Sequence, residues 1–437
     1  MKSNMKMPNA ILRRLFAGIV CLTGTVALFA QPSQTLYTVT VKPDRADWIY
    51  RTGEDAEFEI SVIRDKTPLN NITVDCEYGP EAMPPVKKLK LEIKNATAKL
   101  KTPGLKSPGF QTVRASFTID NTTYSSYTNV GYEPENILPT QVMPDDFKAF
   151  WDRAKADAAQ IPLEPLLTLQ PDLCTSALDV YHIRFQNDAR GSYIYGMLCI
   201  PKQPGTYPAV LRVPGAGVHS FTGDRALAGR GVITLEIGIH GIPVNLPQHV
   251  YGDLASAALN GYAFYNMDNK DKYYFKRVYV GCRRAVDFIY TLPAFDGQNV
   301  AVIGGSQGGA LAVVTAALDP RIKCFASRHP GTCDLSGFMH GRPGGWPGLK
   351  NRPHVEQLLE TAKYYDVVNF ARTLQTPGYF TWGFNDTACP PTTMFSAYNV
   401  IRADKTLKVY TETAHWHFPE QNAAFENWTL EKLGVIK

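Results

Sequence analysis

The chain has 437 residues, of which 44% are hydrophobic and 19% are charged. This is the composition of a globular protein with ample material for a core, and the length predicts roughly two or three domains. The formal net charge is +5, but four of the basic residues lie within the first 30 residues, which contain no acid. The rest of the chain is nearly neutral, which argues against a nucleic-acid-binding surface or a polybasic membrane patch.

Residues 1–30 have the pattern of a signal peptide. Basic residues precede an apolar run over residues 15–30, and Ala30 is followed by polar residues, as expected for a cleavage site. One alternative is a membrane anchor, but the run is short because a span needs about 20 apolar residues. Another is a lipoprotein, which Val20 before Cys21 fits poorly. We therefore expect a secreted or periplasmic protein with no membrane span in the mature chain.

Seven cysteines follow the predicted signal peptide. Their number is odd and they are not closely spaced, so they predict neither a disulfide framework nor a metal site. Most are interpreted as small buried apolar residues, although an oxidising compartment would permit a pair. They are Cys76, Cys174, Cys199, Cys282, Cys324, Cys333 and Cys389.

Residues 31–133 predict an all-β, immunoglobulin-like sandwich. Apolar and polar residues alternate in short runs with turn residues roughly every 8–12 positions, which is typical of antiparallel strands. The runs cover residues 36–41, 57–63, 72–74, 89–93 and 112–117. This segment contains no cluster of acid, base and nucleophile, so we expect it to be separable from the chemistry. A chain that begins near Leu138 would then keep its activity on small esters.

Residues 134–143 predict a linker, and residues 144–437 a second domain. The second domain opens with a helical pattern, and the acids that follow Pro144 suit the first turn of a helix because of its dipole. Strands and helices then alternate. The predicted strands cover residues 179–186, 193–200, 207–213, 231–237, 299–304, 322–327, 377–383 and 407–412. The predicted helices cover residues 222–230, 276–291, 308–318, 392–402 and 420–433. Several strands are continuous apolar runs, which indicates an α/β fold with a mostly parallel sheet covered by helices on both faces.

The strongest chemical signal is the run Gly304-Gly305-Ser306-Gln307-Gly308-Gly309, which lies between a predicted strand and a predicted helix. Gly-x-Ser-x-Gly in this context is typical of a nucleophile elbow, a strained turn that lifts the serine hydroxyl above the sheet. Bulkier residues at Gly304 and Gly308 would collide with the strand and the helix. The alternative is a glycine-rich turn without chemistry.

A serine hydroxyl needs an adjacent base, and in such folds an acid and a histidine follow the serine on later loops. Asp386 follows the strand at residues 377–383 and is the predicted acid; the alternative is an N-cap or turn aspartate. His415 follows the last predicted strand and is the predicted base, although His417 lies two residues away and remains an alternative.

An oxyanion hole needs two backbone N–H groups. The predicted donors are Gln307, directly after the serine, and Ala216, in the glycine-rich loop after the strand at residues 207–213; a plain turn is the alternative for this loop. Residues 242–275 are rich in tyrosine and phenylalanine and predict an entrance for sugar rings. The alternative is that these rings pack a domain or subunit contact. Tyr262, Tyr265 and His240 are the candidate substrate-binding residues.

With these residues in place, residues 144–436 resemble the acetyl xylan esterase family that also deacetylates cephalosporins, carbohydrate esterase family 7. The matching segments are Asp146-Phe147-x-x-Phe150-Trp151, Tyr273-Tyr274-Phe275-x-Arg277-Val278-Tyr279, the glycine-rich run around Ser306, Tyr365-Asp366-x-Val368-Asn369-Phe370-Ala371 and Asp386-Thr387-x-Cys389-Pro390-Pro391. The resemblance implies an α/β-hydrolase fold, a catalytic triad at Ser306, Asp386 and His415, and removal of acetyl groups from sugars and small esters with neither a metal nor another cofactor.

Three positions depart from the family pattern. Its Arg-Gly-Gln motif corresponds here to Gly238-Ile239-His240, its His-Gly to Pro214-Gly215, and its His-Glu to His415-Trp416. We expect a serine esterase acting on acetylated carbohydrate, and the sequence leaves open whether the chain forms a homo-oligomer. The alternatives are a carboxylesterase for another acyl group, a peptidase on the same fold, or a catalytically inactive carbohydrate-binding surface protein.

Overall fold

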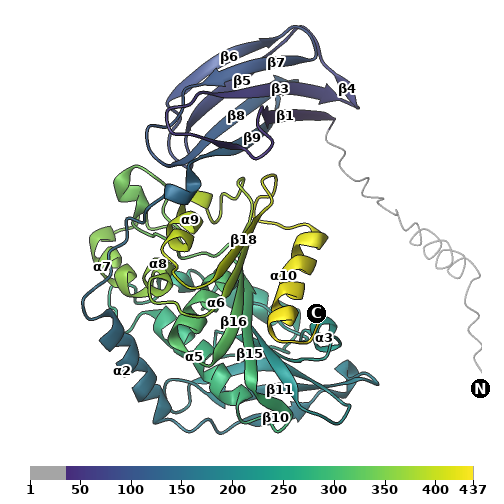
Figure 1. The fold of residues 1–437 in the computed structure, drawn as a ribbon, viewed down its shortest axis with the longest axis vertical. Helices are drawn as coiled ribbons and strands as arrows, with labels where there is room; N and C mark the ends of the chain where they lie inside the picture. The colour runs from purple at the N-terminus through teal and green to yellow at the C-terminus, as the bar shows by residue number, and fades with distance from the viewer. Residues whose placement is uncertain (1–35, 437) are drawn as a thin grey trace, which may run out of the picture.

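The computed structural model describes residues 36–436, and Figure 1 shows their arrangement as a β-rich unit above a larger α/β unit. The predicted signal peptide at residues 1–30 lies outside the described residues. Within residues 36–436, none of the helices is both long and apolar enough to cross a bilayer.

The N-terminal unit consists of two sheets that share one hydrophobic core. One sheet has the order β1-β3-β4 with β7 paired to β3, and the other has the order β2-β9-β8-β5-β6. The strands are β1 (Tyr37–Pro43), β2 (Ile49–Tyr50), β3 (Ala56–Arg64), β4 (Thr67–Pro68), β5 (Ile72–Pro80), β6 (Lys87–Ile93), β7 (Thr97–Thr102), β8 (Gly109–Ile119) and β9 (Thr122–Tyr132). Phe58 and Ile60 from the first sheet and Val113 and Val130 from the second are fully buried in this core. Alternate side chains along the strands, as in β1 and β8, point into this core between the two sheets, which is the arrangement of a β-sandwich.

The predicted linker contains one short helix, η1 (Pro134–Asn136), and is tied to the α/β unit by two buried acids. The backbone N–H of Thr140 donates to Asp334 Oδ1 over 2.8 Å, and the Gln141 side chain donates to Asp366 Oδ2 over 3.1 Å. Helix α2 (Phe147–Ala159) follows. The expected acids precede its first turn rather than lying within it, because the helix begins only after Asp146.

The α/β unit is built on a nine-stranded sheet with the order β10-β11-β12-β14-β13-β15-β16-β17-β18. The pairs from β10 to β14 are antiparallel, and those from β14 through β13 to β18 are parallel. The strands are β10 (Leu166–Leu169), β11 (Leu178–Gln186), β12 (Tyr193–Pro201), β13 (Tyr207–Arg212), β14 (Ile233–Gly238), β15 (Phe295–Gly305), β16 (Ile322–Arg328), β17 (Gly378–Trp382) and β18 (Lys405–Val409). All eight predicted strands are present, and β10 was not predicted.

Helices cover both faces of this sheet, which explains the continuous apolar runs in its strands. In β15, Val300 and Val302 face the layer with α5 and α6, whereas Ala301 and Ile303 face α3 and α10. The helices are α3 (Arg225–Ala228), α4 (Gln248–Ser256), α5 (Tyr274–Ile289), α6 (Gln307–Leu318), α7 (Val355–Tyr365), α8 (Val367–Ala371), α9 (Pro391–Asn399) and α10 (Pro419–Lys432), with short turns η2 (Pro171–Leu173), η3 (Tyr262–Phe264) and η4 (Gly337–His340). The predicted helix at 222–230 is shortened to α3, and α4, α7 and α8 were not predicted.

The sandwich packs against the end of the sheet where β17 ends, above α9 and β18 in Figure 1. Phe110 of β8 meets Phe384 edge-on, with ring centroids 4.9 Å apart, and stacks on Phe395 of α9 at 5.8 Å. Phe110 is 2% exposed and belongs to the hydrophobic core of the α/β unit. Because parallel strands carry functional loops at their carboxyl ends, this contact places the sandwich beside the candidate site.

Candidate active site

Ser306 occupies a strained turn between β15 and α6. Its φ of 61° and ψ of −126° are rare for a residue with a side chain, and such strain is typical of functional positions. The turn is held by two backbone bonds: the Ser306 N–H donates to the carbonyl of Arg328 over 2.9 Å, and the Gly331 N–H donates to the carbonyl of Ser306 over 3.0 Å.

The glycines that flank the serine are required by close backbone approaches. A Cβ at Gly304 would lie 2.3 Å from the carbonyl oxygen of Gly308, in the first turn of α6. A Cβ at Gly308 would lie 2.5 Å from the carbonyl oxygen of Val213, at the end of β13. Carbon atoms do not approach so closely, so the predicted steric reason for both glycines holds.

His415 and Asp386 meet the serine in the order that proton transfer requires. His415 Nε2 lies 3.0 Å from Ser306 Oγ, and His415 Nδ1 lies 2.8 Å from Asp386 Oδ2. The Asp386 side chain is completely buried, and its Oδ1 accepts the backbone N–H groups of Ala388 and Cys389 at 2.9 and 2.8 Å. These bonds fix the carboxylate, so Asp386 both forms a local turn and faces the histidine. Among the hydrogen bonds of the described residues, His417 bonds to neither Ser306 nor Asp386.

The two predicted oxyanion donors lie on facing segments. Gln307 is the first residue of α6, where a backbone N–H has no partner within the helix. Its side chain spans to the opposite loop, with Nε2 donating to the carbonyl of Gly215 over 3.1 Å. Ala216 is exposed in that loop, and its N–H makes no hydrogen bond to the described residues. Among the hydrogen bonds of the described residues neither N–H has a partner, but Ala216 is exposed whereas Gln307 is fully buried.

Two of the three candidate substrate residues, Tyr262 and His240, support this loop from within. The Tyr262 hydroxyl donates to Gln307 Oε1 over 2.7 Å and accepts the Gly217 N–H over 3.1 Å. His240 Nε2 lies 2.9 Å from the carbonyl oxygen of Gly217. Tyr262 is only 7% exposed, and burial raises its pKa, whereas burial lowers the pKa of His240 and keeps the imidazole neutral. The Tyr265 hydroxyl bonds to two carbonyls of its own loop.

One buried histidine near the site was not found in the sequence. The His329 ring follows β16, and its centroid lies 4.4 Å from that of His415. Burial, followed by the charge of His415, holds the pKa of His329 well below its usual value. Ligand atoms of His329, Asp386 and His415 lie within 4.8 Å of one another, so this trio could hold a metal ion, but only at the expense of the bond between Asp386 and His415. His329 lies in the loop after β16, so no helix or strand periodicity in the sequence indicates its position.

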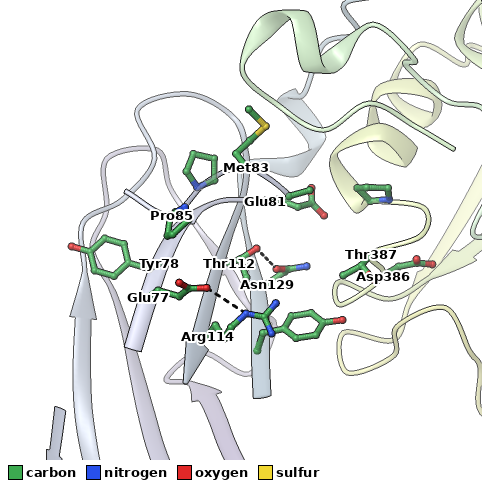
Figure 2. A pocket seen from close by; sticks show the side chains of 15 residues that line it. Glu77, Tyr78, Glu81, Met83, Pro85, Thr112, Arg114, Asn129, Asp386 and Thr387 are labelled. Atoms are coloured by element: carbon green, nitrogen blue, oxygen red, sulfur yellow. Dashed lines mark hydrogen bonds and ion pairs between the residues drawn. The ribbon is translucent and has the colours of Figure 1, made fainter. Parts of the chain in front are cut away.

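Two cavities lie between the sandwich and the loop that contains Asp386 and Thr387. Figure 2 shows the smaller one, of about 130 Å³, whose lining includes Asn129 of the sandwich together with Asp386 and Thr387. A larger one, of about 360 Å³, is lined by Met83 of the sandwich and Trp346 of the α/β unit. The sequence predicted neither contribution of the sandwich.

A mostly parallel sheet, carrying a strained serine with a histidine and a buried carboxylate in reach, defines the class of α/β-hydrolases. Residues 133–432 match the family described as acetyl xylan esterase (AXE1). The acetyl esterase Axe7A of Xylanibacter ruminicola is 38% identical over an alignment of 438 positions that covers 98% of each chain. The chain therefore belongs to the acetyl xylan esterase family and is a carboxylic ester hydrolase.

Solved structures match the α/β unit. The acetyl xylan esterase from Paenibacillus sp. R4 aligns with a TM-score of 0.59 and 27% identity, over 68% of this chain and 98% of its own. Acetyl xylan esterase 1 from Thermoanaerobacterium sp. JW/SL YS485 gives a TM-score of 0.59 at 24% identity, over 69% and 98%, which supports the fold alone. These alignments leave about a third of this chain unmatched, whereas the alignment with the Xylanibacter relative extends over nearly the whole chain.

Proposed function

We propose that this protein removes acetyl groups from acetylated carbohydrate, such as xylan or xylo-oligosaccharides, through an acetyl-enzyme at Ser306. The observation that carries the proposal is the continuous relay from Ser306 Oγ through His415 to the buried Asp386, with both hydrogen bonds at 3.0 Å or less. Family membership supports the acetyl group and the sugar as substrate.

In the first half-reaction, Ser306 Oγ attacks the acetyl carbonyl carbon while His415 Nε2 takes the hydroxyl proton. Asp386 accepts the Nδ1–H of His415, fixes the ring and stabilises the imidazolium. The N–H groups of Gln307 and Ala216 would bind the oxyanion, a contribution that mutagenesis of other enzymes puts at about 10²–10³-fold per donor. His415 then protonates the sugar oxygen, the ester bond breaks, and the deacetylated sugar leaves.

In the second half-reaction, water replaces the sugar. His415 takes a proton from water, the hydroxide attacks the acetyl carbonyl, and the bond to Ser306 Oγ breaks as that oxygen recovers its proton. Acetate is released and the enzyme returns to its starting state. Burial lowers the pKa of His240, and the neutral ring can donate its Nε2–H to the Gly217 carbonyl while its Nδ1 accepts the Tyr274 hydroxyl, which suits a supporting role behind the loop of Ala216.

We further propose that residues 31–133 form one domain and residues 144–437 the esterase domain, joined by the linker at 134–143. The pattern of residues 1–30 supports export by a signal peptide, to the periplasm or the exterior. Acetylated plant polysaccharide is too large to enter a cell, which fits this location. We also propose a sugar contact at Tyr265, together with assembly into a homo-oligomer.

The test is acetate release from acetylated xylo-oligosaccharides, measured beside p-nitrophenyl acetate, propionate and butyrate. We expect acetate esters to have the highest kcat/KM, and propionyl esters to be slower by about 10–200-fold, the range for one methylene in an apolar pocket. Ser306→Ala should abolish release from every substrate. A higher kcat/KM for butyrate than for acetate would refute the acetylesterase assignment, and full activity of Ser306→Ala would refute the mechanism.

A further inference from the structure

We propose that Asn129 and Tyr127, both on β9 of the sandwich, are positioning residues that hold Asp386 in its catalytic orientation. The sandwich is then a working part of the active site rather than an appended module. This inference rests on the proposed role of Asp386 as the acid of the triad. It also reverses the expectation from the sequence that the sandwich is separable from the chemistry.

The contacts are made to the two residues that directly precede Asp386. The Asn129 side chain donates from Nδ2 to the carbonyl of Phe384 over 2.8 Å, and its backbone N–H donates to Asn385 Oδ1 over 2.9 Å. The Tyr127 hydroxyl donates to the carbonyl of Asn385 over 2.8 Å. Three bonds from one strand thus fix the backbone and the side chain that lead into the acid.

The sandwich also fixes the orientation of the Asn129 amide. Its Oδ1 accepts the Thr112 hydroxyl of the neighbouring strand β8 over 2.6 Å, as Figure 2 shows, so the Nδ2 group is directed at Phe384. Asn129 is 1% exposed, and a buried carbonyl at Phe384 would lose its partner if this amide were removed. The arrangement is rigid because each polar atom of the amide has a partner.

The polar contacts of the sandwich are concentrated on this loop and on the start of helix α9, which follows it. Within the described residues, four hydrogen bonds join residues 36–132 to residues 144–436, and all four end within residues 384–392. The fourth runs from the Thr392 N–H to Glu81 Oε2 over 3.2 Å, on the far side of Asp386. A surface that only joined two domains would be expected to spread its hydrogen bonds over several loops, whereas these four end within residues 384–392.

The two residues before Asp386 are also bonded to the segment that leads to His415: the Phe384 and Asn385 N–H groups donate to the carbonyls of Thr411 and Thr413 over 3.2 and 3.1 Å. The Asp386 carboxylate is fixed relative to residues that follow it, by the N–H groups of Ala388 and Cys389. A loop that turned as one body would carry the carboxylate away from His415 without breaking those bonds. The contacts from Asn129 and Tyr127 oppose that rotation from the sandwich side, and the bonds to Thr411 and Thr413 oppose it from the side of His415. A misplacement of about 1 Å in a catalytic group costs on the order of 10²-fold in rate.

The experiment uses the full-length protein with Asn129→Ala and Tyr127→Phe, assayed on p-nitrophenyl acetate. Asn129→Ala should lower kcat by about 10–100-fold and Tyr127→Phe by about 3–10-fold, with KM changed by less than about 3-fold, because positioning affects the transition state more than substrate binding. Thr123→Ala is the matched control: it removes an exposed hydroxyl pair with Thr118 at the other end of the same strand, and should leave kcat unchanged.

A double-mutant cycle with Asp386→Asn separates positioning from general damage to the fold. If Asn129 acts through Asp386, adding Asn129→Ala to Asp386→Asn should lower the rate no further, because residues that act as a unit are non-additive. The rate of Ser306 labelling by a fluorophosphonate provides the readout when turnover is too slow. A further 10-fold loss in the double variant would overturn the proposal, as would wild-type kcat in both single variants. Retention of activity by Asp386→Asn would instead refute the triad itself.

Discussion

We expect Gly308→Ala, which adds a single methyl group, to lower kcat because the group collides with the backbone at the end of β13. Gly308 lies in the first turn of α6, with an ordinary helical backbone, so alanine would be favoured there by about 1 kcal/mol from helix propensity alone. However, its Cβ would lie 2.5 Å from the carbonyl oxygen of Val213 and 3.1 Å from that of Pro214. Relief of this collision requires α6 and the end of β13 to separate by at least about half an ångström.

That separation occurs between the two segments that carry the proposed oxyanion donors, Gln307 and Ala216. Overpacking of this kind costs about 1–3 kcal/mol in stability, and displaced donors should lower kcat by about 10–100-fold. The assay is kcat on p-nitrophenyl acetate together with the unfolding midpoint in urea. Gly252→Ala in α4 is the control, because a Cβ there meets nothing within 4 Å. A Gly308→Ala variant with wild-type kcat and stability would refute the steric account of the elbow.

Four further variants test the site and its surroundings. His415→Gln should lose about as much kcat as Ser306→Ala, several orders of magnitude, whereas His417→Gln should lose about tenfold or less; the reverse ranking would move the base to His417. Tyr262→Phe should lower kcat by about tenfold on both oligosaccharides and p-nitrophenyl acetate, because the Tyr262 hydroxyl bonds to Gln307 and Gly217 beside the proposed oxyanion donors. A change only in KM for oligosaccharides would instead indicate a sugar contact. Burial raises the pKa of Glu81 from 4.5 to about 8, so between pH 4.5 and 8 this carboxyl is protonated in the folded state and ionised in the unfolded state. The free energy of unfolding should therefore fall as pH rises from about 4.5 through 8. Glu81→Gln should flatten this pH profile, measured by urea unfolding, and an unchanged slope would contradict the prediction.

The sequence predicts the sheet well because its strands are marked by hydrophobic runs. Each predicted strand of the α/β unit lies within a few residues of an observed one, as the comparison of 322–327 with β16 illustrates. Helices α4 and α7 were missed because each has only a few buried side chains, which gives no clear apolar stripe. Helix α8 was missed for another reason: it is only five residues long and almost wholly buried.

The arrangement of Ser306, Asp386 and His415 could be predicted because each residue is marked locally, by glycine spacing or by its place after a strand. The contact between Asn129 and Asn385 could not be predicted, since the two residues are 256 positions apart and each alone reads as an ordinary polar residue. The same applies to the aromatic segment, where alternation of tyrosines does not tell an open surface from a buried hydrogen-bond network. Positions of the supporting residues depend on tertiary contacts that no local pattern encodes.

The most direct test of the central claim is covalent labelling of the purified protein with a fluorophosphonate, followed by mass-spectrometric mapping of the modified peptide. The account predicts one phosphonate per chain, on Ser306, with labelling lost in Ser306→Ala and slowed by orders of magnitude in His415→Gln. Stoichiometric labelling of any other serine, or an active protein whose Ser306 does not react, would contradict it.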